Sequence, residues 1–273
     1  MSVSVKRIAI NFGGGYVPGL NAVISGAVLA AWTDGRAGNS DVYARSVDAG
    51  GDLGEEIVVH PAPGDQQLPQ AAYNPDDDEY LVVWQDYRQG TSNPDIYGQR
   101  VTSEGVPAGD NIAINTASYR QIAPHVAYAT EGKVYLVVWC HYPGTADDAY
   151  DVYGQRLSRT GQPQGSSLVI ANESGTTGQE YPTDVVYNST SDRFLVLWDD
   201  MAATKYWDVW GRHVSTDGSL GSVVQITTLS GYHEDSGAGA YDPDDDQYLI
   251  TWKYRAVANG AGDIQGRRMT GSG

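Results

Sequence analysis

The stretch Tyr80–Trp84, which reads YLVVW, decides the fold because it recurs along the chain. Related segments are AVLAAW at Ala27–Trp32, YLVVW again at Tyr135–Trp139, FLVLW at Phe194–Trp198 and YLITW at Tyr248–Trp252. Successive tryptophans of this set lie between 52 and 59 residues apart, and a second segment of the type DIYGQRV follows each one. Two segments that recur five times in step indicate a repeat architecture.

Each repeat predicts four short strands. The first precedes the YLVVW-like segment, the second is that segment, the third is the DIYGQRV-like segment, and the fourth is a brief apolar pair such as that in Ile112–Ile114. The second segment is apolar on both faces, which is typical of a strand covered on both sides. Four strands in a repeat of this length indicate a β-propeller. We therefore predict an all-β, five-bladed β-propeller with four-stranded blades, forming a single domain over residues 1–273.

The predicted repeat units are 12–60, 61–115, 116–171, 172–228, and 229–273 together with 1–11. The last unit ends after its third strand, and the missing strand is found at the other end of the chain. Lys6–Asn11, KRIAIN, is similar to the fourth strand Asn111–Asn115, NIAIN. We expect this N-terminal strand to complete the last blade and close the ring, which would cover an otherwise open sheet edge.

The composition excludes some partners. The chain has a formal net charge of −17 and a sequence pI near 4.4, which disfavours nucleic acid and anionic membrane surfaces as ligands. No segment is apolar enough to insert in a bilayer, and we expect a monomer. The single cysteine, Cys140, lies in an apolar run and is expected to be a buried, inert thiol.

The repeat resembles the YLVVWxD…DIYGQRV propeller repeats of predicted bacterial and archaeal surface proteins. The resemblance covers nearly the whole chain and implies an extracellular or cell-surface location, although Met1–Ile10 does not read as a signal peptide. Because that family is uncharacterised, the resemblance implies a fold and no activity.

A second resemblance covers only Lys6–Ala31, which is similar to the N-terminal glycine-rich segment of phosphofructokinases. The matching residues of the GGGxxPGxNA pattern are Gly13, Gly14, Gly15, Pro18, Gly19, Asn21 and Ala22. In that family the segment would hold phosphate on backbone N–H groups. The catalytic aspartates of the family are not recognisable here, so we expect no phosphotransferase activity, and we expect Asn21–Ala31 to be extended and not helical.

The loops that follow the YLVVW-like segments are long and dissimilar, whereas the turns on the opposite face are short and uniform. Variation on a repeated scaffold is where specificity usually lies. Aromatic rings beside amides and carboxylates suit a sugar, so we predict a non-catalytic, glycan-binding module, with a protein–protein interaction scaffold as the alternative. Many of these side chains would also serve a purely structural role at strand ends. The candidate ligand-binding residues are Tyr16, Asp34, Arg36, Gln66, Asp86, Arg88, Tyr119, Gln121, His141, Gln179, Tyr181, Asp200, Trp207 and His233.

A second alternative is a glycoside hydrolase with carboxylates in the central funnel, where Asp34, Asp86 and Asp200 would supply the acid and the base. Their equivalent repeat positions argue against it, because catalysis needs unlike environments that separate two pKa values. We therefore assign no catalytic residue. The aspartates that open the third strands, Asp95 and Asp208 among them, recur in all five repeats and are expected to cap or turn the chain.

No cofactor is predicted, and calcium is the one candidate metal. Acidic turns place carboxylates together at Asp76–Asp78 and Asp244–Asp246, and hard oxygen ligands suit Ca²⁺. Asp76, Asp78, Asp244 and Asp246 are the candidate ligands. The equivalent turns of other repeats lack these acids and connect the same strands, so a solvated hairpin is the default interpretation.

Overall fold

The structure is a computed structural model, which describes residues 23–24, 27–36, 38–48, 50–144, 150–172, 178–201, 206–257 and 260–273. These residues contain strands and no helix, and hence no helix that is long and apolar enough to cross a membrane. Three expectations lie outside the described residues: Tyr16 as a ligand contact, the glycine-rich loop 13–15, and the closing strand 6–11.

The strands form five antiparallel sheets in the described part of the chain, and within each sheet the neighbours follow chain order. Four of the sheets have four strands and the last has three. The strand bounds are β1 Val23–Ile24, β2 Ala27–Asp34, β3 Asp41–Val47 and β4 Ile57–Val58; β5 Gln66–Asn74, β6 Glu79–Asp86, β7 Asp95–Thr102 and β8 Pro107–Asn115; β9 Arg120–Ala129, β10 Val134–Tyr142, β11 Asp151–Ser158 and β12 Pro163–Ala171; β13 Glu180–Asn188, β14 Arg193–Asp200, β15 Asp208–Ser215 and β16 Leu220–Gln225; and β17 His233–Asp242, β18 Gln247–Arg255 and β19 Asp263–Thr270.

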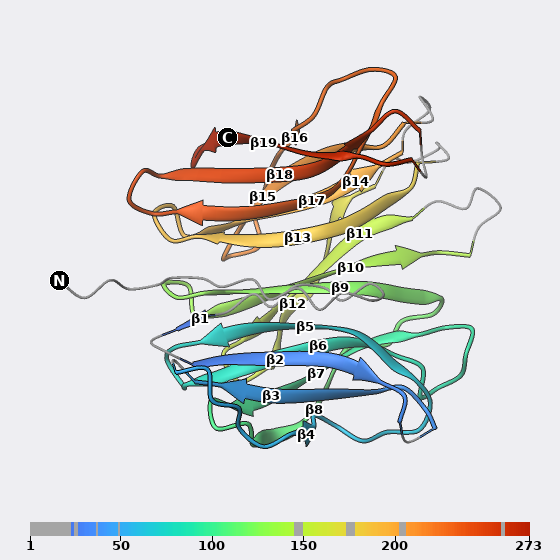
Figure 1. The fold of residues 1–273 in the computed structure, drawn as a ribbon, viewed down its shortest axis with the longest axis vertical. Helices are drawn as coiled ribbons and strands as arrows, with labels where there is room; N and C mark the ends of the chain where they lie inside the picture. Colours follow the sequence, from blue (N-terminus) through green and yellow to red (C-terminus); the bar gives the residue numbers. More distant parts are fainter. Residues whose placement is uncertain are drawn as a thin grey trace.

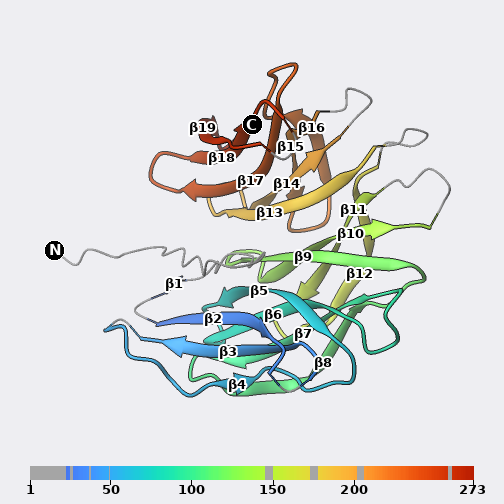
Figure 2. The ribbon, with the colours of Figure 1, turned by 45° about the vertical axis from the view of Figure 1, so that its right-hand side comes forward.

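The prediction of an all-β fold built from small antiparallel sheets is confirmed. Each sheet lies within one predicted repeat unit, and β2 shows that residues 27–31 are extended. The sheets are stacked in chain order, from β2–β4 at the bottom of Figure 1 to β17–β19 at the top, and Figure 2 shows the same order. The first strands β5, β9, β13 and β17 of successive sheets contact one another.

The hairpin turns between first and second strands explain how such different sequences reach the same geometry. The last turn residue has a positive φ in four sheets, at Asp78 (54°), Lys133 (53°), Asp192 (47°) and Asp246 (48°). In three of them a tyrosine hydroxyl from the first strand donates a hydrogen bond to that aspartate; Tyr73 is the donor to Asp78. Aspartate tolerates the left-handed conformation better than most residues, which explains its use here.

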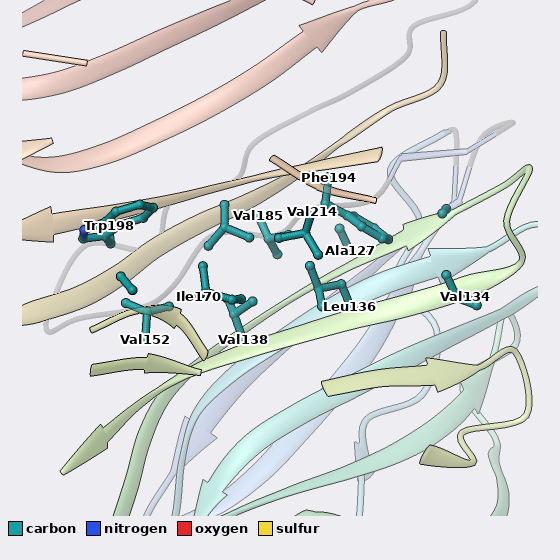
Figure 3. Close-up of a cluster of buried hydrophobic side chains, with 13 residues drawn as sticks. Ala127, Val134, Leu136, Val138, Val152, Ile170, Val185, Phe194, Trp198 and Val214 are labelled. Atoms are coloured by element: carbon teal, nitrogen blue, oxygen red, sulfur yellow. The ribbon is translucent and has the colours of Figure 1, made fainter. Parts of the chain in front are cut away.

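The packing between sheets has a direction. In the second to fifth sheets the tryptophan of the second strand packs against the preceding sheet, as Trp198 of β14 does against β9–β12. The leucine three residues earlier points the opposite way, toward the following sheet. Figure 3 shows the interface between the third and fourth sheets, where Leu136 and Trp198 belong to one cluster of buried side chains. We call these two surfaces the tryptophan face and the leucine face of a sheet.

The leucine face is covered in every sheet but the last. Leu81, Leu136 and Leu195 are at most 1% exposed, whereas Leu249, the equivalent residue of β18, is 51% exposed. At the other end of the stack, Trp32 of β2 is partly exposed, while Trp84 and Trp139 are fully buried. The first sheet therefore exposes its tryptophan face and the last sheet exposes its leucine face. In the sheets between them both faces are covered.

A glycine in the middle of three third strands permits close packing within the sheet. A Cβ atom at Gly154 of β11 would lie 2.7 Å from Cδ1 of Ile170, which comes from the fourth strand. The equivalent Gly98 and Gly211 have comparable neighbours, at 3.0 Å from Ile114 and 3.2 Å from Leu195. The glycine of the YGQR motif thus lets an apolar side chain of a neighbouring strand cross over the third strand.

Candidate active site

One end of each sheet carries a row of polar residues that face each other across the strands. The row comprises the first residue or residues of the first strand, the end of the second strand and the start of the third. We call these the rim rows. They are Asp34–Asp41 in the first sheet, Gln66–Asp86–Asp95 in the second, Gln121–His141–Asp151 in the third, Glu180–Asp200–Asp208 in the fourth and Glu234–Tyr254–Asp263 in the fifth.

In three sheets a rim residue accepts a hydrogen bond from the indole N–H of the second-strand tryptophan. Nε1 of Trp84 donates to Oδ2 of Asp86 at 2.7 Å, and Nε1 of Trp139 donates to Oε1 of Gln121 at 2.8 Å. In the fifth sheet the acceptor is Glu234, at 3.1 Å from Nε1 of Trp252. A buried indole N–H needs a partner, so these rim residues have a structural role in the sheet interface.

Asp34 and Asp86, two members of the proposed funnel set, are engaged by arginines. Asp86 is fully buried and accepts hydrogen bonds from the guanidinium of Arg88, which also lies 3.8 Å from the ring centre of Tyr97. Arg36 binds Asp34 in the same way and lowers the pKa of that carboxyl to about 2. These ion pairs order the loops after β2 and β6.

The remaining candidates of the second and third sheets are dispersed. Gln66 is buried, and its amide lies against the backbone of His60 and Ala62. His141 shares the acceptor Gln121 with Trp139, at 3.0 Å from Nδ1 to Oε1, and burial lowers its pKa. Tyr119 is 50% exposed.

Among the four rim rows with three described residues, that of the fourth sheet is the one in which all three are acidic. Glu180 lies opposite Asp200, and Asp200 lies opposite Asp208. Residues directly opposite each other on antiparallel strands have Cβ atoms roughly 5 Å apart and project from the same face. Glu180 and Asp200 are only 2% and 3% exposed, whereas Asp208 is partly exposed. The strand register thus places three acidic residues in one row, and two of them are buried.

A fourth carboxylate approaches this row from the next sheet. The backbone N–H of Glu234 on β17 donates to the carbonyl oxygen of Trp207 at 2.7 Å, next to Asp208. Burial, followed by the charge of Glu234, raises the pKa of Asp208 to about 6. The expectation that the third-strand aspartates only cap or turn the chain is therefore incomplete, because a carboxyl with this pKa can hold a proton near neutral pH.

A raised pKa alone does not distinguish Asp208. Burial, followed by the charge of Asp86, also raises the pKa of Asp95 to about 6 at the equivalent position of β7. The difference lies in the surroundings: Asp95 is 5% exposed and Asp86 beside it is paired with Arg88, whereas Asp208 is more exposed and follows Trp207. Asp95 is therefore a natural control for Asp208.

Partly exposed aromatic rings adjoin the acidic row. The ring centres of Tyr181 and Trp207 are 5.8 Å apart and tilted by 57°, so Tyr181 does not cover the face of the indole by stacking. Tyr150 lies 4.9 Å from Tyr181, and Tyr142 lies 4.9 Å from Tyr150, which makes a continuous chain of rings. The structure thus brings together the predicted residues Tyr181 and Trp207, which are the chain neighbours of Glu180 and Asp208.

Two further candidates flank this region. Gln179 precedes Glu180 and accepts a hydrogen bond from the backbone N–H of Met201 at 3.1 Å through its own carbonyl oxygen. His233 precedes Glu234, is 7% exposed, and has its ring centre 5.3 Å from that of Tyr206.

The sequence analysis missed Glu180 and Glu234, although a signal for them exists. Counting back 18 residues from each second-strand tryptophan gives Gln66, Gln121, Glu180 and Glu234. This constant spacing marks the first-strand member of the rim row in four sheets. A search for aromatic and amide residues selected their neighbours, Gln179 and His233, instead.

The acidic turns proposed for calcium make other contacts. Asp76 forms an ion pair with Lys133 and accepts a hydrogen bond from the Tyr128 hydroxyl, and Asp246 accepts one from Tyr241. Asp78 accepts hydrogen bonds from the Tyr73 and Ser103 hydroxyls. Within the described residues no group of three or more His, Cys, Asp or Glu side chains is arranged to hold a metal ion. The role of Asp76, Asp78, Asp244 and Asp246 in calcium binding remains a prediction.

The fold is similar to those of several solved structures. The α-L-arabinanase of Penicillium chrysogenum complexed with arabinobiose aligns with a TM-score of 0.58 and 15% identity, over 90% of this chain and 72% of the other. The endo-arabinase of Bacteroides thetaiotaomicron aligns at 0.54 and 12%, over 88% and 92%. The Hadza microbial sialidase Hz136 aligns at 0.58 and 11%, over 84% and 52%. At these identities the likeness establishes a shared fold.

No protein-family model matches the sequence, and no curated protein is significantly similar to it. The structural comparisons nevertheless correct the main functional expectation. A non-catalytic glycan-binding module is the wrong interpretation, because the solved structures with this fold include arabinanases and a sialidase. The chain is similar in fold to carbohydrate-cleaving enzymes, which agrees better with the glycoside hydrolase alternative.

Proposed function

We propose that the protein is a glycoside hydrolase whose active site is the acidic rim row of the fourth sheet. The observation that carries the proposal is the direct opposition of Asp200 to Glu180 and Asp208 on adjacent strands. Glycoside hydrolysis needs two carboxyl groups with separated pKa values, one protonated and one ionised. The raised pKa of Asp208, about 6, supplies the protonated member of such a pair.

The roles follow from exposure and charge. Asp208 is the most accessible member of the row, and its pKa of about 6 suits a general acid that protonates the leaving oxygen. Asp200, opposite it, is the carboxylate partner that accepts a proton from the attacking water. Trp207 and Tyr181 offer apolar ring surface beside the acids, which suits the C–H faces of a sugar.

The proposed set of funnel carboxylates is thereby narrowed to one sheet. Asp34 and Asp86 form ion pairs with Arg36 and Arg88, so their carboxylate oxygens are already engaged and they are unsuitable as acid and base. Asp200 is retained from that set, and Asp208, Glu180 and Glu234 join it.

The test is hydrolysis of a panel of aryl glycosides and of arabinan, xylan and pectin. Asp208→Asn and Asp200→Asn should each lower kcat at least ~100-fold on whichever substrate is cleaved. The matched control is Asp95→Asn, which changes the equivalent residue of β7 with the same raised pKa and should leave kcat unchanged. Absence of hydrolysis across the panel, or an equal loss in all three variants, would contradict the proposal.

We also propose that the five sheets are the blades of a closed five-bladed propeller, with residues 6–11 as the outer strand of the last blade. Among the described strands β19 has no outer neighbour, whereas β7, β11 and β15 pair with β8, β12 and β16. The similarity of KRIAIN to the NIAIN segment of β8 supports this role.

A further inference from the structure

Arg120, the first residue of β9, lies at the rim of the third sheet. It is opposite Tyr142 on β10, one position beyond the pair Gln121–His141. Its side chain is partly exposed. Opposite residues project from the same face of a sheet, so Arg120 and Tyr142 share the face that also carries Cys140.

Arg120 differs from the other arginines at the rims. Three other rim arginines each form an ion pair with an aspartate of the same sheet. These pairs are Arg36–Asp34, Arg88–Asp86 and Arg255–Asp235. Among the described residues, no carboxylate lies within ion-pair distance of Arg120 and no hydrogen bond of its guanidinium is observed. That Arg120 has no acidic partner among the described residues is notable in a chain with 34 acidic and 17 basic residues.

The surroundings of Arg120 connect it to the proposed active site. The chain of rings runs from Tyr142, opposite Arg120, through Tyr150 to Tyr181, which is adjacent to Glu180. Burial raises the pKa of the Cys140 thiol; the charges of Asp151 and Glu180 act in the same direction, and the charge of Arg120 acts against them. Arg120 also opposes the rise that burial causes in the pKa of Tyr181. The guanidinium and the acidic rim row therefore border the same region.

A guanidinium in this setting suits one class of ligand group. Its planar array of donors binds a carboxylate in a bidentate manner, which gives both affinity and orientation. The neighbouring tyrosines add apolar ring surface for the body of a sugar. Because the chain as a whole is strongly acidic, its overall field repels anions, and an anionic ligand needs a dedicated local cation.

We propose that Arg120 binds the carboxylate of an acidic sugar residue, so that the substrate class is a glycan containing a uronic acid. This inference rests on the proposed glycoside hydrolase site and adds its specificity. Arg120 is then a specificity-determining residue, which contacts substrate without taking part in proton transfer.

The experiment measures binding to the full chain by calorimetry with probes that differ only in a carboxylate. One pair is an α-1,4-linked galacturonic acid trisaccharide and the neutral galactose trisaccharide. The other pair is a xylo-oligosaccharide with and without a glucuronic acid branch. We expect at least one acidic probe to bind at least ~10-fold more tightly than its neutral counterpart.

Three variants assign that preference to Arg120. Arg120→Met should abolish it, whereas Arg120→Lys, which keeps the charge but loses the bidentate geometry, should retain part of it. Arg268→Met removes the same charge from an exposed position on β19 and should leave the preference intact. The inference is overturned if neither acidic probe is preferred, if the preference survives in Arg120→Met, or if Arg268→Met loses it equally.

Hydrolysis assays on the same variants separate this inference from the proposed function. Hydrolysis that depends on Asp208 but shows no preference for acidic glycans would overturn the role of Arg120 alone. Binding of an acidic probe that depends on Arg120, without hydrolysis of any glycoside, would overturn the proposed hydrolase and leave the acidic-sugar site.

Discussion

Asp199 of β14 accepts a hydrogen bond from the backbone N–H of Ser236 on β17, with 2.7 Å between Oδ2 and N, and so links the fourth sheet to the fifth. In the second sheet the equivalent residue is Gln85, whose Oε1 accepts the same bond from the N–H of Ala123 at 3.2 Å. The acceptor of this hydrogen bond between sheets is therefore a neutral amide in one interface and an ionisable carboxyl in another. Burial raises the pKa of Asp199 to about 7, with Asp235 adding to the rise and Arg255 opposing it.

The first prediction is that Asp199→Asn stabilises the protein at high pH only. The folded-state pKa of Asp199 is raised from 3.8, so the stability that the protonated group contributes is complete below about pH 4 and is lost as the pH rises to about 7. At pH 8 the variant should melt at a higher temperature than the wild type, and its free energy of unfolding should be larger by at most roughly 4 kcal/mol. At pH 4 the two melting temperatures should be equal. Gln85→Glu is the converse control and should lower stability at pH 8. An equal shift of Asp199→Asn at both pH values would contradict this account.

The second prediction concerns the pH profile of hydrolysis. If Asp208 acts as the acid, kcat should fall as the pH rises through about 6, where its carboxyl loses its proton. Glu234→Gln removes a negative charge that raises this pKa, so the alkaline limb should move to lower pH. The amide oxygen of glutamine can still accept the bond from Trp252. If kcat of Glu234→Gln fell at the same pH as kcat of the wild type, the pH dependence of the rate would not arise from Asp208.

The third prediction tests the glycine of the third strand. Gly154→Ala should destabilise the protein by about 1–3 kcal/mol in urea unfolding, because the new Cβ would crowd Cδ1 of Ile170. Ile170→Val removes that Cδ1 atom, so the double variant should recover part of the loss caused by the alanine. If the losses of stability from Gly154→Ala and Ile170→Val simply added, the effect of the alanine would come from the backbone of β11 and not from contact with Ile170.

The fourth prediction tests ring closure. Removing residues 1–12 should lower the melting temperature, because the proposed outer strand of the last blade would be lost and β19 would become an edge. A cysteine pair introduced at Ile8 and at a β19 position next to Gly266 should form a cross-link if the two strands are neighbours. An unchanged melting temperature in the truncated chain would rule out the closing role.

The strands were predictable from the sequence because their signal is local. The apolar segment Tyr80–Trp84 lies within β6, and the DIYGQRV segment coincides with β7. Two of the candidate residues chosen from the sequence, Tyr181 and Trp207, lie next to each other in the structure. These inferences needed only the period of the repeat and the alternation of side chains along a strand.

The carboxylates of the site were less predictable because their partners depend on register. First strands contain an irregularity at which a non-glycine residue has a positive φ, as at Leu68 (53°), Ala123 (51°) and Ser236 (60°). The pairing shifts at this point, between Gln67 and Gln70 in the second sheet. No glycine stands at the shift in the second, third or fourth sheet. The sequence alone therefore could not place Glu180 opposite Asp200 or show that Asp86 is held by Trp84 and Arg88.

The opposed tryptophan and leucine faces make each sheet a head-to-tail building block. Such a contact is heterologous, and a series of heterologous contacts either closes on itself or continues from one molecule to the next. The partly exposed Trp32 and the exposed Leu249 are the two complementary ends of that series within one chain. A protein that fails to bring these ends together would therefore present matching surfaces to its neighbours, and its failure would take the form of linear polymers rather than of isolated, unfolded chains.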